Sequence, residues 1–242
     1  MIDADAGVEL EWGLQGVETL AARCDHLVLV DVLSFTTCVE RALSRGAEVL
    51  PRRWHNNTAV SFARDRGARL AVRREDAGPA DLSLSPASMD ALQAGEAMVL
   101  PSPNGASLSV AARSHGSVWA ACFRNASATA RHLSRLGGRV GVVPAGERWA
   151  DGSLRPAFED LLGAGAVALR LRGELSPEAA MAKAAFLSLR GALLRQLPAC
   201  TSGLELCGRG FAADVELAAE LDVSETLCEL VGDGYVARSG RP

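Results

Sequence analysis

The sequence predicts an α/β fold, a largely parallel or mixed sheet with helices packed against it. Short apolar runs alternate with amphipathic stretches of roughly 10–15 residues, which is the pattern of strands joined by crossover helices. Four segments share one plan, in which an apolar run leads into a polar loop and then into a helical pattern. The runs are His26–Val30, Ala97–Leu100, Ser117–Cys122 and Arg139–Val143.

The remaining elements follow from weaker signals. Short apolar runs at 47–50 and 69–72 are expected to join the same sheet, and a helix is expected to open behind Pro156. Pro177 suits the first position of a further helix, and more helices are expected at 203–207 and 212–221, with a last strand at 234–238. No segment reads as a linker, so we expect a single domain over residues 1–242.

Composition excludes several classes of protein. The chain has 242 residues, of which 48% are hydrophobic and 22% are charged, as in a folded globular protein. No apolar run approaches the ~20 residues that cross a bilayer, and the acidic start of the chain lacks the features of a signal peptide. We therefore expect no membrane association and a cytoplasmic location. The net charge of −4, spread along the chain, argues against a nucleic-acid partner.

Polar residues follow all four apolar runs directly, and they include Asp31, Asn104, Asn125 and Glu147. In open α/β sheets ligands bind outside the carboxyl ends of the strands. If the strands are parallel, these loops meet at one edge of the sheet. The sequence therefore predicts a site built from the four loops.

The first loop combines an aspartate with hydroxyl groups. Asp31 ends a buried run, and Ser34, Thr36 and Thr37 stand at the start of the following helix. Hydroxyl and free backbone N–H groups at a helix N-terminus suit an anion. Asp31 is then a ligand of Mg²⁺ or a nucleophile, whereas the alternative is a simple helix cap.

The second and third loops offer amides and a cation. Gly105 permits close approach of the backbone, and the Asn104 amide can bind either metal or phosphate. Arg124, next to Asn125, could clamp an anionic group. Both segments are also compatible with ordinary capped turns.

The fourth loop carries the strongest signal. Glu147, Asp151, Glu159 and Asp160 fall within fourteen residues, with Arg148 beside the first of them. Two or three carboxylates with water oxygens are a ligand set that Mg²⁺ prefers, and phosphatases use such a cation to neutralise charge on the transferred group. The helix macrodipole would also favour acids at 159 and 160, but it does not explain Glu147. Asp214 is the distal candidate acid.

These residues resemble a known family, the 2-phosphosulfolactate phosphatases, which are Mg²⁺-dependent acid phosphatases linked to coenzyme M synthesis. The resemblance covers about 27–220. It rests on Asp31–Thr37, Ser102–Gly105, Asn125–Ala126, Ala145–Arg148, Glu159–Asp160 with Gly165–Ala166, and Asp214. It implies a three-layer α/β/α fold, Mg²⁺, and hydrolysis of a phosphate monoester on a short sulfonated acid.

The chain departs from the family at three places, one of which is Gly163–Gly165, where the family has Cys-Ala-Gly. Ser34 stands where many members carry arginine, and Arg73–Asp81 replaces a segment that tends to be rich in glycine and acids. These differences bear on the substrate, while the acids that suit a metal are kept.

We therefore expect a Mg²⁺-dependent phosphatase acting on small phosphorylated carboxylic or sulfonic acids. Asp31, Glu147 and one of Glu159, Asp160 or Asp214 would hold the cation. Asn104, Asn125, Arg124 and Arg148 would contact the anion.

Two other functions remain open. One is a catalytically silent anion-binding protein of the same fold, which Ser34 favours, and the other is a Mg²⁺-dependent hydrolase of a larger metabolite. Apolar C-terminal helices also allow a homo-oligomer.

Overall fold

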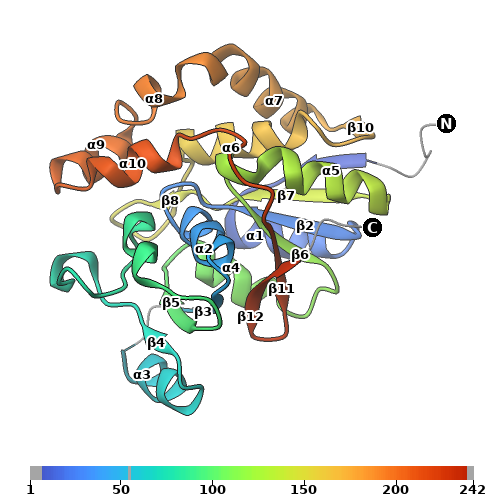
Figure 1. Cartoon of the computed structure of the whole chain (residues 1–242). Coiled ribbons are helices and arrows are strands. Elements are labelled where there is room, and N and C mark those ends of the chain that lie inside the picture. The colour runs from blue at the N-terminus through green and yellow to red at the C-terminus, as the bar shows by residue number, and fades with distance from the viewer. Residues whose placement is uncertain (1–6, 54–55, 239–242) are drawn as a thin grey trace.

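The computed structural model describes residues 7–53 and 56–238, and Figure 1 shows a sheet with helices on both faces. The strands are β1 (Gly7–Leu10), β2 (His26–Val30), β3 (Glu48–Arg52), β4 (Arg69–Leu70), β5 (Ala97–Pro101), β6 (Val118–Ala121), β7 (Val140–Pro144), β8 (Glu147–Arg148), β9 (Leu154–Arg155), β10 (Glu174–Leu175), β11 (Leu227–Val231) and β12 (Gly234–Arg238).

The α-helices are α1 (Gly13–Ala21), α2 (Phe35–Ser44), α3 (Asn56–Asp65), α4 (Gly105–Ala112), α5 (Ala126–Leu136), α6 (Phe158–Ala168), α7 (Pro177–Leu189), α8 (Leu193–Gln196), α9 (Thr201–Gly208) and α10 (Ala212–Ala218). Short 3₁₀ helices lie at Arg74–Asp76, Pro86–Ala91, Phe123–Asn125 and Arg190–Ala192. The described helices include none that is long and apolar enough to cross a membrane.

Ten of the described strands form one mixed sheet in the order β10-β1-β7-β2-β6-β11-β12-β3-β5-β4. The five strands from β10 to β6 are parallel to one another. The hairpin β11–β12 is antiparallel to both of its neighbours, and β3, β5 and β4 form a second parallel block. Because three antiparallel pairings separate the blocks, the second block runs opposite to the first.

The sheet wraps around α2. This helix packs against β6, β11, β12 and β3, and the rings of Phe35 and Tyr235 lie 6.2 Å apart, edge to face. Twist accumulates from strand to strand in any sheet, and Figure 1 shows β11 and β12 running across the direction of β2 and β7. The twist brings the loop after β5 back to the end of β2.

The three layers follow from the alternation of side chains along the strands. In β2, Val28 and Val30 belong to the core beneath α5, α6 and α7, whereas Leu27 and Leu29 belong to the core shared with α1, α2 and α4. Successive side chains of a strand point to opposite faces, so a strand buried on both sides needs helices on both. The predicted α/β class and its three-layer arrangement are confirmed.

Two glycines let α6 approach its neighbours closely. A Cβ atom on Gly163 would lie 2.7 Å from Val32 Cγ2, and one on Gly165 would lie 2.1 Å from the carbonyl oxygen of Ala182 in α7. α6 therefore lies directly on the sheet and α7 lies directly on α6. The six cysteines are free thiols.

Two sequence expectations about the fold need correction. β1, α1 and β11 were not expected, and the helix that begins at Pro177 is interrupted at Arg190–Ala192 before α8. The expected reason for the meeting of the polar loops is also wrong, because their strands are not all parallel. β5 belongs to the opposite block, and only the twist of the sheet brings its loop to β2.

Candidate active site

Asp31 lies at the end of β2, where two helices begin. Its carboxylate accepts the backbone N–H of Phe35 at 3.1 Å through Oδ1 and that of Gly105 at 2.7 Å through Oδ2. These residues open α2 and α4, so the positive ends of two helix dipoles face one carboxylate. The side chain is held in one orientation and is 6% exposed.

Gly105 is the residue that this arrangement requires. A Cβ atom at this position would lie 2.4 Å from Phe35 Cδ1 and 2.6 Å from Asp31 Oδ2. Both distances are below any normal contact, so a larger side chain would displace the carboxylate. The close approach at Gly105 is thus to Asp31 and Phe35, and Gly105 itself, expected as a substrate contact, lines neither of the two cavities at this site.

Glu147 opens β8 in the loop after β7. The preceding Gly146 has a φ of 68°, which is a left-handed conformation that glycine adopts readily. Asn104 donates its amide N–H to Glu147 Oε2 at 2.8 Å, so the loop after β5 orients this acid.

Asp160 ties these loops together from the first turn of α6. Its Oδ1 accepts the N–H of Val32 at 2.8 Å, and its Oδ2 accepts the N–H of Gly146 at 2.8 Å. The segment after Asp31 and the segment before Glu147 are thereby fixed to the same carboxylate.

The buried acids repel one another. Burial raises the pKa of Asp31 to about 6, and the N–H bonds from Phe35 and Gly105 only partly oppose it. Burial, together with the charge of Asp31, raises the pKa of Glu147 to about 7. Burial and the neighbouring Asp31 raise the pKa of Asp160 well above its usual range. This end of the site is therefore suited to a cation.

A cavity of about 170 Å³, here called the Asp31 cavity, joins these acids to two arginines. Asp31, Glu147 and Asn104 line one part of it, and Arg74 and Arg209 line another. The remaining lining residues are Leu33, Ser34, Leu84, Ser102, Pro103, Ser202, Glu205 and Leu206.

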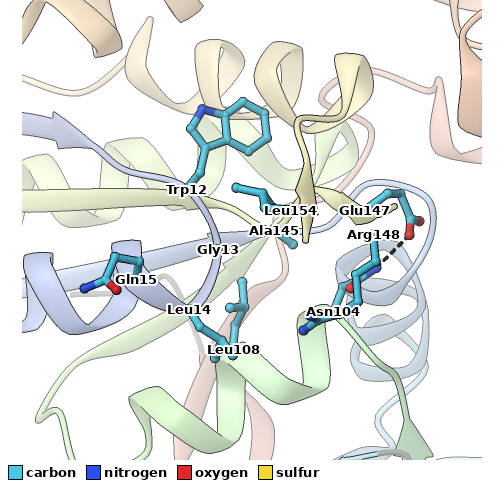
Figure 2. Close-up of a pocket in the computed structure, with 10 residues that line it drawn as sticks. All are labelled: Trp12, Gly13, Leu14, Gln15, Asn104, Leu108, Ala145, Glu147, Arg148 and Leu154. Carbon is cyan, nitrogen blue, oxygen red and sulfur yellow. Dashed lines mark hydrogen bonds between the residues drawn. The ribbon is translucent and has the colours of Figure 1, made fainter. Parts of the chain in front are cut away.

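A second cavity of about 290 Å³, here called the Trp12 cavity, shares Asn104 and Glu147 with the first. Its other lining residues are Trp12, Gly13, Leu14, Gln15, Leu108, Ala145, Arg148 and Leu154. Figure 2 shows Asn104 and Glu147 facing each other on one side of this cavity, across from Gln15. The hydrogen-bonded pair of Asn104 and Glu147 therefore lies at the border of the two cavities.

The other predicted acids have different surroundings. Glu159 is buried beside Cys200, whose Sγ lies 3.4 Å from its Oε2. Asp214 accepts the hydroxyl of Ser85 at 2.6 Å, on the arginine side of the Asp31 cavity. Asp151 lies in an exposed turn, where it accepts hydrogen bonds from Ser153.

Four predicted substrate contacts have their polar atoms bound within the protein. Thr36 and Thr37 donate their hydroxyls to the carbonyls of Asp31 and Val32. Arg124 pairs with Glu40 and Glu220, and Asn125 binds the backbone at Cys122, Ala120 and Thr226. None of the four lines either cavity. Ser34 and Arg148 do, the first in the Asp31 cavity and the second in the Trp12 cavity.

A family model described as 2-phosphosulpholactate phosphatase matches residues 16–233, which is most of the chain. The chain belongs to the 2-phosphosulfolactate phosphatase family. Membership implies a phosphatase whose substrate is a small phosphorylated molecule. No curated protein sequence matches the chain.

The Asp31 cavity is also lined by residues that were not predicted as site residues from the sequence. Arg74, Arg209 and Ser102 line the Asp31 cavity, yet none was a candidate. Arg74 comes from a short 3₁₀ helix and Arg209 follows α9, so neither stands at a strand end. The one available signal was Arg73–Asp81 itself, the segment in which the chain departs from its family.

In the part of the chain that the structure describes, no group of three or more acid, histidine or cysteine side chains is placed to hold one metal ion. The five acids predicted as metal ligands are therefore not gathered at a single point. Of the five, only Asp31 and Glu147 line the Asp31 cavity.

Proposed function

We propose that the protein is a cytoplasmic, Mg²⁺-dependent phosphatase that hydrolyses the phosphate monoester of a small acid such as 2-phosphosulfolactate. The proposal rests on the family membership and above all on the Asp31 cavity. There the buried carboxylate of Asp31, the half-buried carboxylate of Glu147 and two arginines face the same small space. A phosphorylated acid needs this combination, because it is an anion and its hydrolysis is assisted by a cation.

Asp31 and Glu147 would hold the cation. Mg²⁺ is usually bound by one or two carboxylates, with water and substrate phosphate oxygens completing its shell. A pair of acids at an open cavity fits this coordination, which does not require further ligands from the protein. The raised pKa values of both acids support the assignment, because a bound cation would remove the repulsion that contributes to them. When bound, Mg²⁺ would neutralise charge on the transferred phosphoryl group.

Backbone and side-chain groups of the protein would orient the two acids. The N–H groups of Phe35 and Gly105 hold the Asp31 carboxylate, and the Asn104 amide holds that of Glu147. Asp160 keeps the two supporting loops in register. Positioned groups of this kind lower the barrier because little reorganisation is needed during the reaction.

The decisive experiment is phosphate release from 2-phosphosulfolactate and a panel of phosphorylated short acids. Each substrate would be assayed with Mg²⁺ and with a chelator, using the wild type, Asp31→Asn and Glu147→Gln. Asp151→Asn is the matched control, because it removes an exposed acid of the same loop. The proposal predicts Mg²⁺-dependent release that both site variants lose and the control keeps. A folded wild type that releases phosphate from none of the substrates would contradict it.

The Trp12 cavity favours one second candidate, a Mg²⁺-dependent hydrolase of a larger phosphate monoester. This cavity adjoins Glu147 and is lined by Trp12, Leu14, Leu108 and Leu154, which suit an apolar group. The same substrate panel tests it if phosphate monoesters with bulky apolar groups are added. Faster turnover of those compounds than of short acids would favour this candidate.

A further inference from the structure

Arg74 is a buried cation with an unused donor. Its side chain is 9% exposed, and its Nη2 donates to Ser34 Oγ at 2.7 Å. The Nε atom is buried and has no hydrogen-bond partner. Buried donors are nearly always satisfied. Arg74 lines the Asp31 cavity, so an incompletely bonded guanidinium at this place indicates a site for a ligand.

Asp214 holds this guanidinium without satisfying it. Its Oδ2 lies 3.7 Å from Arg74 Nε, which is too far for a hydrogen bond, and this oxygen also has no hydrogen-bond partner. The other oxygen, Oδ1, accepts the Ser85 hydroxyl at 2.6 Å and the N–H of Ala87 at 3.2 Å. Asp214 is thus anchored, and its charge lies beside the Nε atom of Arg74.

A second cation lies near the first. The guanidinium carbons of Arg74 and Arg209 lie 5.3 and 5.7 Å from the ring centre of Phe211. No ion pair joins either arginine to Asp31 or Glu147, although all four line the same cavity. The cavity therefore has an acidic end, at Asp31 and Glu147, and a basic end, at Arg74 and Arg209, with no direct ion pair between the two ends. Arg209 is paired with Glu75 instead.

From this arrangement we infer that Arg74 binds a second acidic group of the substrate, a carboxylate or sulfonate next to the phosphate ester, and that Asp214 positions Arg74 for it. The inference rests on the proposed function, because only a phosphatase would have this ligand as its substrate. The acidic end takes the cation and with it the phosphate, and the basic end takes the remaining anion. Arginine suits this role because its planar donors match the oxygens of a carboxylate or sulfonate.

Two phosphate monoesters of nearly equal size test the inference. 2-Phosphoglycerate carries a carboxylate beside the ester, and glycerol 2-phosphate has a hydroxymethyl group there. The wild type should prefer the first compound. Arg74→Gln should reduce the ratio of the two kcat/KM values by about 10- to 100-fold, since a charge-assisted hydrogen bond is lost. Arg74→Lys should restore part of the ratio.

Arg73→Gln is the matched control, because Arg73 is the adjacent exposed arginine, paired with Asp76 outside the cavity. This variant should keep the wild-type ratio. Asp214→Asn should lower the ratio in the same direction as Arg74→Gln, mainly through KM for 2-phosphoglycerate. A change of stability alone would alter both substrates equally. Equal losses on both substrates in Arg74→Gln, or no loss on either, would overturn the inference.

Binding measured by calorimetry with a chelator separates this inference from the proposed function. If the wild type releases no phosphate from any compound but binds 2-phosphoglycerate through Arg74, the phosphatase proposal fails and the acid-binding role stands. If phosphate is released and the affinities of wild type and Arg74→Gln for 2-phosphoglycerate are equal, the inference fails and the phosphatase proposal stands.

Discussion

β6 and β7 lie on either side of β2, and each leads into a loop that is rich in polar side chains. After β7, Glu147 faces the Asp31 cavity and is held by one amide. After β6, Arg124 is paired with Glu40 and Glu220, and Asn125 binds three backbone groups. The two loops have similar places in the fold. They differ in whether their polar atoms are already bound within the protein. The loop after β7 therefore contributes to the cavity, whereas the loop after β6 stabilises the fold.

The largest expected effect lies in the loops at the cavity. Glu147→Gln and Asp31→Asn should each reduce phosphate release by about 10²- to 10⁴-fold, because the cation that these acids would hold contributes several kcal/mol of transition-state stabilisation. Glu147→Gln should leave the folded state as stable as the wild type or more stable, because a half-buried, repelled charge is removed. Asp31→Asn should be less stable, because an amide cannot accept both backbone N–H groups that the carboxylate accepts. Steady-state kinetics and thermal unfolding measure the two effects. Loss of folding together with activity in Glu147→Gln would contradict this distinction.

The next largest effect is a loss of stability on substitution in the loop after β6. Arg124→Gln leaves the buried Glu40 carboxylate without its cation, which should cost about 3–5 kcal/mol of unfolding free energy. Turnover by the folded protein should stay close to that of the wild type. Arg131→Gln is the control, because Arg131 pairs with Glu225 on the surface. Denaturant unfolding would show a small change for the control, and equal losses in both variants would show that the buried pair has no special role.

These two loops also show what the sequence could and could not predict. Asp31 and Glu147 were predicted because each follows an apolar run, and both line the Asp31 cavity. The helix expected after Asp31 is present as α2. Arg124 and Asn125 follow an apolar run as well, so the same signal selected them. Their partners Glu40, Glu220 and Thr226 are distant in sequence, and no local pattern reveals such partners.

Other parts of the site depend on tertiary structure in the same way. Arg74 reaches Ser34 across forty positions of the chain, and its loop has no strand or motif to mark it. β11 separates the two parallel blocks, but it is a five-residue strand at the end of a helical region. The reversal of the second block could not be inferred from short apolar runs, because strand direction depends on pairing partners.

A third effect concerns pH. The pKa of Glu147 is raised from 4.5 to about 7, so the folded protein holds a proton that the unfolded chain loses at lower pH. Glu147 should therefore lower the free energy of unfolding of the metal-free protein by roughly 3 kcal/mol as pH rises from about 4.5 to 7. Glu147→Gln should flatten this part of the profile, and Mg²⁺ should stabilise the wild type more at pH 7 than at pH 5. A profile unchanged by the substitution would contradict the assigned pKa.

The smallest effect concerns the helix start that holds Asp31. Gly105→Ala would place a Cβ atom against Asp31 Oδ2 and Phe35, and overpacking of this kind costs about 1–3 kcal/mol. Activity should fall as well, because the carboxylate must shift. Gly116→Ala is the control, since a Cβ atom there meets nothing within 4 Å. Wild-type kinetics in Gly105→Ala would show that Asp31 tolerates a different orientation.

The most direct test of the contrast between the two loops is a paired measurement of turnover and thermal unfolding on Glu147→Gln and Arg124→Gln. Glu147→Gln should keep or raise its Tm and lose turnover. Arg124→Gln should lose about 10 °C of Tm and keep the turnover of its folded fraction. The reverse pattern, an active Glu147→Gln or a stable and inactive Arg124→Gln, would contradict the assignment of the site to the loops around Asp31 and Glu147.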